Sequence, residues 1–313
     1  MTLAAPFPYF GGKRRAAPRI WQALGDPSGY VEPFAGSAAV LLARPSFKGR
    51  RVETLNDADG WLVNTWRAIQ LSPDAVAAAA WGPVSEIDYH ARLAWLQERR
   101  TPDLVAWLEG DPEAHDAKAA GWWLYVLACG IGDPFGPGPW RVVDGHLRKV
   151  GNAGRGVNRE LPHLGDAGKG QLRAYMQALA ERLHRVRITC GSWERVVKPS
   201  VTRSGTGGDG SRAVFLDPPY ATSGDLYAHA GGDVAVAVRE WCMVAPRQLR
   251  IILCGYDDEH DALLGHGWIV TEGKAGGGAG YSVNPTNGRS ERLWLSPASI
   301  GTEQPSLLTL ATP

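Results

Sequence analysis

The sequence contains few cysteines and no long apolar run, and both shortages narrow the class of protein. Its four cysteines are scattered along 313 residues without a C-x-x-C pair, so neither a disulfide framework nor a zinc site is indicated. No apolar run approaches the roughly 20 residues of a membrane span. The first residues lack a signal-peptide pattern. We therefore expect a cytosolic protein whose thiols are reduced.

Three further absences restrict the ligand. The eight histidines show neither H-x-x-x-H nor H-E-x-x-H spacing, so metal catalysis is not indicated. The first predicted strand–turn–helix unit, over residues 30–42, has no G-x-G-x-x-G pattern and no Walker lysine, which disfavours a dinucleotide or a triphosphate. The formal net charge of +1 provides no long-range attraction to phosphates, so only an uneven charge distribution can favour nucleic acid.

The stretch Asp217-Pro218-Pro219-Tyr220 follows the apolar run 213–216, and the other motifs are arranged around it. The run predicts a buried strand that stops at a rigid turn, where an open α/β sheet binds ligands. The Asp217 carboxylate and the Pro218 carbonyl are a stiff acceptor pair that suits a planar amino group. Tyr220 can stack on the ring that bears this group. An ordinary turn can have the same sequence, so the remaining motifs must decide.

A strand, a glycine turn and a helix are predicted early in the chain, over residues 30–42. This is the first unit of a nucleotide-binding α/β sheet. The turn at Gly36 and Ser37 precedes a helix, a position that can take the carboxylate of an amino-acid ligand. A second predicted strand, over 51–55, leads to Asp57, which is placed to bind ribose hydroxyls. Capping of the next helix is the alternative role for Asp57.

Residues 71–169 interrupt the alternation of strands and helices. Helical stretches at 75–80 and 88–99 are followed by a shift to Gly, Pro and basic residues beyond position 130. Between residues 141 and 173, seven Arg and Lys oppose three acids, so we expect a flexible basic loop that can track phosphates. Many charged loops are only solvated. The candidates for DNA contact are Arg148, Lys149, Arg155 and Arg159.

The C-terminal part returns to alternating helices and strands. An apolar stripe at helical spacing and several short apolar runs support this interpretation. The predicted elements, in order, are a helix over 171–185, a strand over 186–189, a helix over 234–242, a strand over 249–256, and an antiparallel pair at 268–270 and 292–295.

Taken together, these motifs and predicted elements resemble those of the DNA adenine methylases. These Dam-like enzymes of bacteria and phages use S-adenosylmethionine to methylate the N6 amino group of adenine. The resemblance covers about residues 6–297, and the compact form is similar to phage members. It rests on four motifs in the family's order: Pro-Tyr-Phe-Gly-Gly-Lys at 8–13, Glu-Pro-Phe-Ala-Gly-Ser at 32–37, Asn-Asp-Ala-Asp at 56–59 and Asp-Pro-Pro-Tyr at 217–220.

The resemblance implies a fold and a division into domains. The fold would be of the α/β class, a Rossmann-like class I methyltransferase sheet with helices on both faces. Residues 1–70 and 170–313 would form the catalytic domain that binds S-adenosylmethionine. Residues 71–169 would form an inserted, mostly helical target-recognition domain that binds DNA.

The resemblance also implies roles for individual residues. Asp217, Pro218, Pro219 and Tyr220 would hold an adenine flipped out of double-stranded DNA. The residues of the cofactor pocket would be Tyr9, Lys13, Glu32, Phe34, Ala35, Gly36, Ser37, Asp57 and Asp217. Ala38 stands where a second glycine is common, and its methyl group would crowd the cofactor.

The expected activity is site-specific methylation of adenine N6 in double-stranded DNA with S-adenosylmethionine as the donor. This activity requires neither a metal nor a membrane. We expect the protein to be a monomer in the cytosol of a bacterium or of a phage-infected host. Two alternatives stay open. One is methylation of cytosine N4 or of a non-DNA amino group, and the other is a DNA-binding protein that keeps the fold without turnover. The recognition sequence cannot be predicted from the insert.

Overall fold

The computed structural model of the protein describes most of the chain. The described residues are 3–7, 12–45, 51–99, 101, 103–130, 135, 140–143, 146–149, 169–202, 210–219, 231–272 and 291–300.

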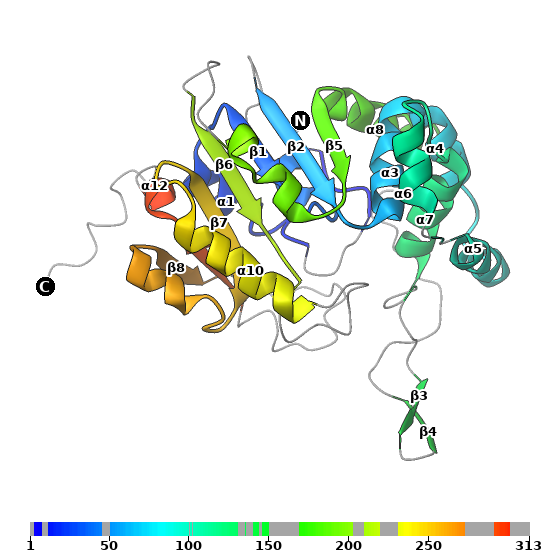
Figure 1. Ribbon diagram of the computed structural model, residues 1–313. Helices are drawn as coiled ribbons and strands as arrows, with labels where there is room; N and C mark the ends of the chain where they lie inside the picture. Colours follow the sequence, from blue (N-terminus) through cyan, green and yellow to red (C-terminus); the bar gives the residue numbers. More distant parts are fainter. Residues whose placement is uncertain are drawn as a thin grey trace, which may run out of the picture.

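A seven-stranded sheet forms the centre of the structure (Figure 1). Its strands are β1 (Gly29–Glu32), β2 (Val52–Asp57), β5 (Val186–Cys190), β6 (Arg212–Leu216), β7 (Arg250–Tyr256), β8 (Ile269–Glu272) and β9 (Glu291–Leu295). In space the order is β5-β2-β1-β6-β7-β9-β8. The first five strands are parallel, and β9 runs antiparallel to both of its neighbours. The prediction of a Rossmann-like methyltransferase sheet with a final antiparallel pair is confirmed.

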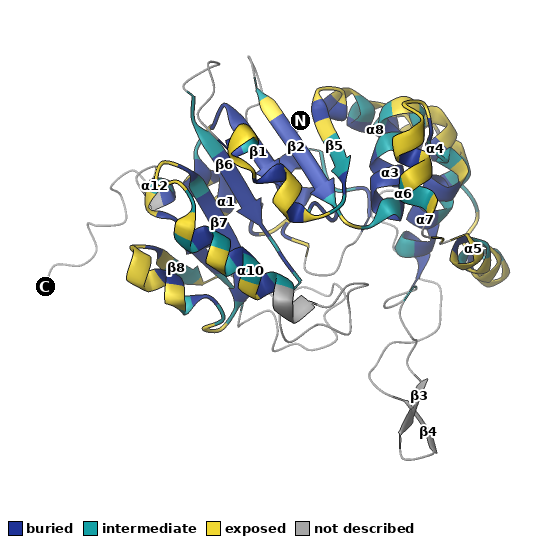
Figure 2. Ribbon diagram, viewed as in Figure 1, coloured by how far each residue is buried: buried dark blue, intermediate teal, exposed yellow. Residues whose placement is uncertain are grey.

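Both faces of the sheet are buried, because successive strand residues pack into different hydrophobic clusters. Tyr30 and Phe215 belong to the larger cluster, whereas their neighbours Val31 and Val214 belong to the second one. Figure 2 shows the central strands largely in the colour of buried residues, with exposed residues on the outer sides of the helices. A parallel sheet covered on both faces has this pattern, and helices on both faces are as predicted.

Different helices cover the two faces. The larger cluster contains α1 (Ala17–Leu24), α2 (Ala39–Leu42), α3 (Gly60–Leu71) and α8 (Lys169–Leu183). The second cluster contains α10 (Gly231–Val244) and two 3-10 helices, η1 (Trp193–Val196) and η3 (Asp261–His266). Two further short helices are α9 (Pro199–Thr202) and α12 (Pro297–Ile300).

A group of helices lies beside the β5 edge of the sheet (Figure 1). It contains α4 (Pro73–Ala80), α5 (Glu86–Glu98), α6 (Asp103–Gly110) and α7 (Ala117–Cys129). Helix α7 packs against α3, α4 and α5, helix α4 also packs against α8, and helix α6 packs against α3. The start of α7 is set by Asp116, whose side chain accepts a hydrogen bond from the Ala119 N–H. Gly121 allows α7 to approach α4 closely, since a Cβ there would lie 2.7 Å from the Ala80 nitrogen. The domain boundaries stay a prediction.

A β-hairpin lies where the sequence predicted a loop. Strands β3 (Trp140–Val143) and β4 (His146–Lys149) pair antiparallel, so the expectation of a loop was wrong for this part of the basic segment. Residues 150–168, where the rest of the loop was expected, lie outside the described residues. The sequence between the two strands is Asp-Gly, a dipeptide typical of two-residue hairpin loops.

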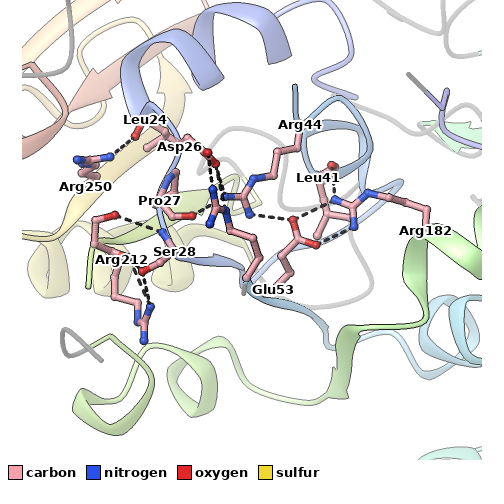
Figure 3. A network of polar contacts seen from close by, with 12 residues as sticks. Leu24, Asp26, Pro27, Ser28, Leu41, Arg44, Glu53, Arg182, Arg212 and Arg250 are labelled. Carbon is pink, nitrogen blue, oxygen red and sulfur yellow. Dashed lines mark hydrogen bonds and ion pairs between the residues drawn. The ribbon is translucent and has the colours of Figure 1, made fainter. Parts of the chain in front are cut away.

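A buried ion-pair network ties β2 to the helices on the larger cluster (Figure 3). Arg182 of α8 donates to both oxygens of Glu53, with Nη1 2.7 Å from Oε2 and Nη2 3.0 Å from Oε1. Arg44, just after α2, donates to Oε1 of Glu53 at 2.9 Å and also to Asp26. Strand β2, which leads to Asp57, is therefore fixed by ion pairs to α8 and to the residue that follows α2 closely in the chain.

The four cysteines are buried and none forms a disulfide, as predicted. No helix among the described residues has the length and hydrophobicity needed to cross a membrane. The same described part of the chain contains no group of three or more His, Cys, Asp or Glu side chains arranged to hold a metal ion.

Candidate active site

Strands β1 and β6 are neighbours in the sheet, and the strand order reverses between them. From β1 the chain continues to β2 and β5 on one side, and from β6 it continues to β7 on the other. Loops that leave such a point in opposite directions open a crevice at the carboxyl ends of the strands. Glu32 is the last residue of β1 and Asp217 directly follows β6, so both carboxyl groups reach this crevice.

A cavity of about 460 Å³ occupies the crevice, a size that suits a small-molecule ligand. Pro219 lines it, while Pro218 is buried and does not. Tyr9 and Tyr220 lie outside the described residues. All the other predicted pocket residues line the cavity: Lys13, Glu32, Phe34, Ala35, Gly36, Ser37, Asp57 and Asp217.

Asp57 braces the turn that follows β1. Its Oδ2 accepts the backbone N–H of Gly36 at 3.0 Å, and its Oδ1 accepts that of Asp59 at 3.0 Å. Burial raises the pKa of Asp57 to about 6, although these two hydrogen bonds lower it. The cap of α3 is Asp59, which accepts from the Trp61 N–H, so the alternative that Asp57 caps this helix was wrong.

Ala38 has a left-handed backbone at the start of α2, with φ 51° and ψ 27°. Glycine adopts this conformation without the cost that a Cβ adds. The Ala38 side chain is fully buried in the core and is not among the residues that line the cavity. We expected the Ala38 methyl group to crowd the cofactor, but it lies in the core and does not line the cavity. The cost of alanine at this position is backbone strain instead.

Glu32 is a buried carboxyl group at the floor of the crevice. Its Oε1 accepts a hydrogen bond from the Tyr30 hydroxyl at 2.7 Å. Burial raises the pKa of Glu32 to about 8, despite the hydrogen bond from Tyr30, which lowers it. Glu32 is therefore largely protonated at neutral pH, and a cation bound beside it would favour the carboxylate.

Lys13 connects two acidic residues at the edge of the cavity. Its Nζ lies 2.7 Å from Oδ1 and 2.8 Å from Oδ2 of Asp217, and 2.8 Å from Oε1 of Glu291. Burial by itself favours the neutral amine, but the two carboxylates raise the pKa of Lys13 well above its usual value. Lys13 is therefore a charged ammonium held between two anions.

The described lining of the cavity is acidic. Lys13 is its sole basic residue among the described ones, and the acidic ones are Glu32, Asp57, Asp59, Glu194 and Asp217. A ligand with positive charge is attracted by this lining, whereas the phosphates of a dinucleotide or a triphosphate are repelled.

Residues 9–81 of the chain match a family model. The family is described as D12 class N6 adenine-specific DNA methyltransferase. The match includes Lys13, the turn at 32–37 and Asp57, and it ends before Asp217. It confirms the resemblance to DNA adenine methylases and the prediction of an enzyme of this class. A comparison with curated proteins found no match.

The predicted DNA-contact residues are only partly described. Arg148 and Lys149 belong to β4, where they pair in register with Arg141 and Trp140, but their side chains are outside the described part. Arg155 and Arg159 lie outside the described residues. Their role in DNA contact stays a prediction.

Sequence reasoning missed several residues of the cavity. Ser192, Trp193 and Glu194 line the cavity after β5, and the Trp193 ring centroid lies 6.2 Å from that of Phe34. The available signal was that they follow a predicted strand, because parallel strands present their carboxyl ends at one edge. Glu291 directly precedes the predicted strand 292–295, and its contact with Lys13 had no local signal.

Proposed function

We propose that the protein is a site-specific DNA methyltransferase that transfers the methyl group of S-adenosylmethionine to the N6 amino group of adenine. The observation that supports this most is the meeting of the 32–37 turn and Asp217 in one cavity. A donor pocket and an acceptor for an amino group must adjoin for methyl transfer. Holding both reactants in place can lower the barrier by about 7–11 kcal/mol.

The acidic cavity supports a cationic cofactor. When bound, S-adenosylmethionine would supply a methyl group from its positively charged sulfur and leave as neutral S-adenosylhomocysteine. The positive charge would pass to the accepting nitrogen, which then loses one proton to give the methylated base. Glu32 would hold the ammonium group. The turn at Ser37 would hold the carboxylate, since the Gly36 N–H already donates to Asp57. Asp57 would accept the ribose hydroxyls. Phe34 and Trp193 offer flat apolar surfaces to an aromatic ring.

The end of β6 would hold the target base. The Asp217 carboxylate and the Pro218 carbonyl would accept the two N–H groups of the amino nitrogen, which makes its lone pair available for attack. Tyr220 would stack on the ring. Because N6 lies inside the duplex, the base must flip out at a cost of a few kcal/mol, which phosphate contacts offset. The candidates for these contacts are Arg148, Lys149, Arg155 and Arg159.

The test is methyl transfer by the purified protein to unmethylated double-stranded DNA, with labelled S-adenosylmethionine and mass analysis of the nucleosides. We expect N6-methyladenine as the product. Label in N4-methylcytosine would identify the cytosine alternative. DNA binding without any incorporation would identify a protein that keeps the fold but not the turnover. Sequencing of DNA from cells that express the protein would locate the methylated site.

A further inference from the structure

Three charged side chains form a buried cluster behind the proposed acceptor of the amino group. This charge cluster consists of Lys13, Asp217 and Glu291, and its exposed fractions are 3%, 21% and 12%. Its members come from the N-terminal segment, from the end of β6 and from the first residue of β9. The Lys13 ammonium contacts both oxygens of Asp217 and one oxygen of Glu291.

A lysine this close would, on its own, oppose the proposed role of Asp217. The pair of Lys13 and Asp217 has no net charge, and its cation lies 2.7 Å from an oxygen that must stabilise a nitrogen becoming positive. The ammonium and the nitrogen that becomes positive would both lie next to this carboxylate, and like charges close together repel strongly where water is excluded. Glu291 changes the total to one net negative charge. Cys254, also near Asp217, stays a neutral thiol, since burial raises its pKa well above the usual value.

We propose that Glu291 is a positioning residue for methyl transfer, which acts on Asp217 through Lys13. It is the second anionic partner of the ammonium and makes the charge cluster net negative when the amino nitrogen becomes positive. It contacts neither ligand in this proposal, which rests on the proposed function. The lysine orients the carboxylate of Asp217 by spanning both of its oxygens, and Glu291 offsets the electrostatic cost of that orientation.

The first test removes the charge and keeps the shape. Glu291→Gln retains an oxygen that can accept from Lys13. We expect its single-turnover methylation rate to fall about tenfold or more, with affinities for S-adenosylmethionine and DNA within about twofold of wild type. Glu291→Asp keeps the charge and should recover most of the rate. The matched control is Glu272→Gln, the same change at an exposed position of the neighbouring strand β8, which should leave the rate unchanged.

The second test needs no activity. Melting temperatures of the cofactor-free protein are compared for Lys13→Met, Glu291→Gln and the double variant. Because Glu291 balances the buried ammonium, we expect the double variant to lose less than the sum of the two single losses. Additive losses would overturn the pairing. If Glu291→Gln does not fold, Glu291→Ala, which also removes the charge, takes its place, and the same fall in rate is expected.

If wild type is active, an unchanged rate in Glu291→Gln, or in Glu291→Ala where it replaces that variant, would overturn the positioning role and leave the proposed function intact. A wild type that transfers no methyl group would overturn the proposed function and the positioning role together. Non-additive melting would then still establish the ion pairing of Lys13 with Glu291 as a structural contact.

Discussion

Gly36 donates its backbone N–H to a carboxylate oxygen of Asp57 at 3.0 Å, across 21 residues of sequence. The residue proposed to bind the ribose therefore also shapes the turn proposed to bind the methionine end of the cofactor. Its other oxygen accepts the Asp59 N–H. Each carboxylate oxygen has two lone pairs, so these hydrogen bonds leave acceptor capacity for hydroxyl groups.

Replacement of Asp57 should weaken cofactor binding. We expect Asp57→Ala to lower the affinity for S-adenosylmethionine about tenfold or more, since it removes the acceptor for charge-assisted hydrogen bonds and the brace of the turn. Asp57→Asn keeps one acceptor oxygen and should lose less. Calorimetric titration of the purified variants measures both affinities. Equal affinity of Asp57→Ala and wild type would contradict the ribose role.

Replacement of Asp217 should remove methylation and leave cofactor binding mostly intact. Asp217→Asn has the same shape without the charge, and we expect a rate about 10²–10³-fold lower, as for the loss of one electrostatic partner of a transition state. Asp217→Ala should abolish turnover. Single-turnover kinetics give the rate and calorimetry gives the cofactor affinity. Methylation near the wild-type rate by either variant would show that the base is held elsewhere.

The stability of the cofactor-free protein should depend on pH through Glu32. The pKa is about 8 in the folded protein against a usual 4.5, so the folded state binds the proton more tightly and its stability falls as the pH rises between these values. The difference between 4.5 and about 8 corresponds to about 5 kcal/mol at the upper end. We expect Glu32→Gln to be more stable than wild type at pH 8 and similar near pH 4.5.

Denaturant titrations of both proteins across this pH range measure the effect. A constant difference between them would contradict the raised pKa of Glu32. The same variant should bind S-adenosylmethionine poorly, because the ammonium group loses its carboxylate. Binding to wild type at pH 7 should release a proton from Glu32, which calorimetry in two buffers of different ionisation enthalpy detects.

Removal of the Ala38 methyl group should leave cofactor affinity unchanged, because Ala38 does not line the cavity. For Ala38→Gly, relief of a left-handed alanine gains about 1–2 kcal/mol. Loss of a buried methyl group costs about 0.8 kcal/mol and the added freedom of glycine about 0.5–1 kcal/mol. The opposing contributions nearly cancel, so thermal melting should change little. A large gain in affinity would show that the methyl group does crowd the cofactor.

The ion-pair network at Glu53 should matter greatly for stability. Glu53→Gln leaves two buried guanidinium groups without their shared anion, and such a loss typically costs about 3–5 kcal/mol. Chemical denaturation measures the change. The control is Asp74→Asn, which breaks the exposed pair of Asp74 and Arg173 and should leave the midpoint nearly unchanged. Similar losses in both variants would contradict the importance of burial.

Much of the sheet was predictable because its signals are local. The apolar run 213–216 predicted the strand that the structure has at Arg212–Leu216, and the leucines of 171–185 predicted the helix Lys169–Leu183. The hairpin at 140–149 also had a local signal in its Asp-Gly dipeptide. It was missed because the count of charges over the whole segment outweighed its turn chemistry.

By itself, the sequence determined which segments become strands and that acidic or glycine-containing motifs stand at their carboxyl ends. These properties depend on residues within one or two turns of the chain. Only the tertiary structure decided that Lys13 pairs with Asp217, 204 residues away, and with Glu291, and that Trp193 reaches the cavity from the edge of the sheet. Such contacts follow from the order in which strands pair, and local patterns of hydrophobicity and turn residues do not encode that order.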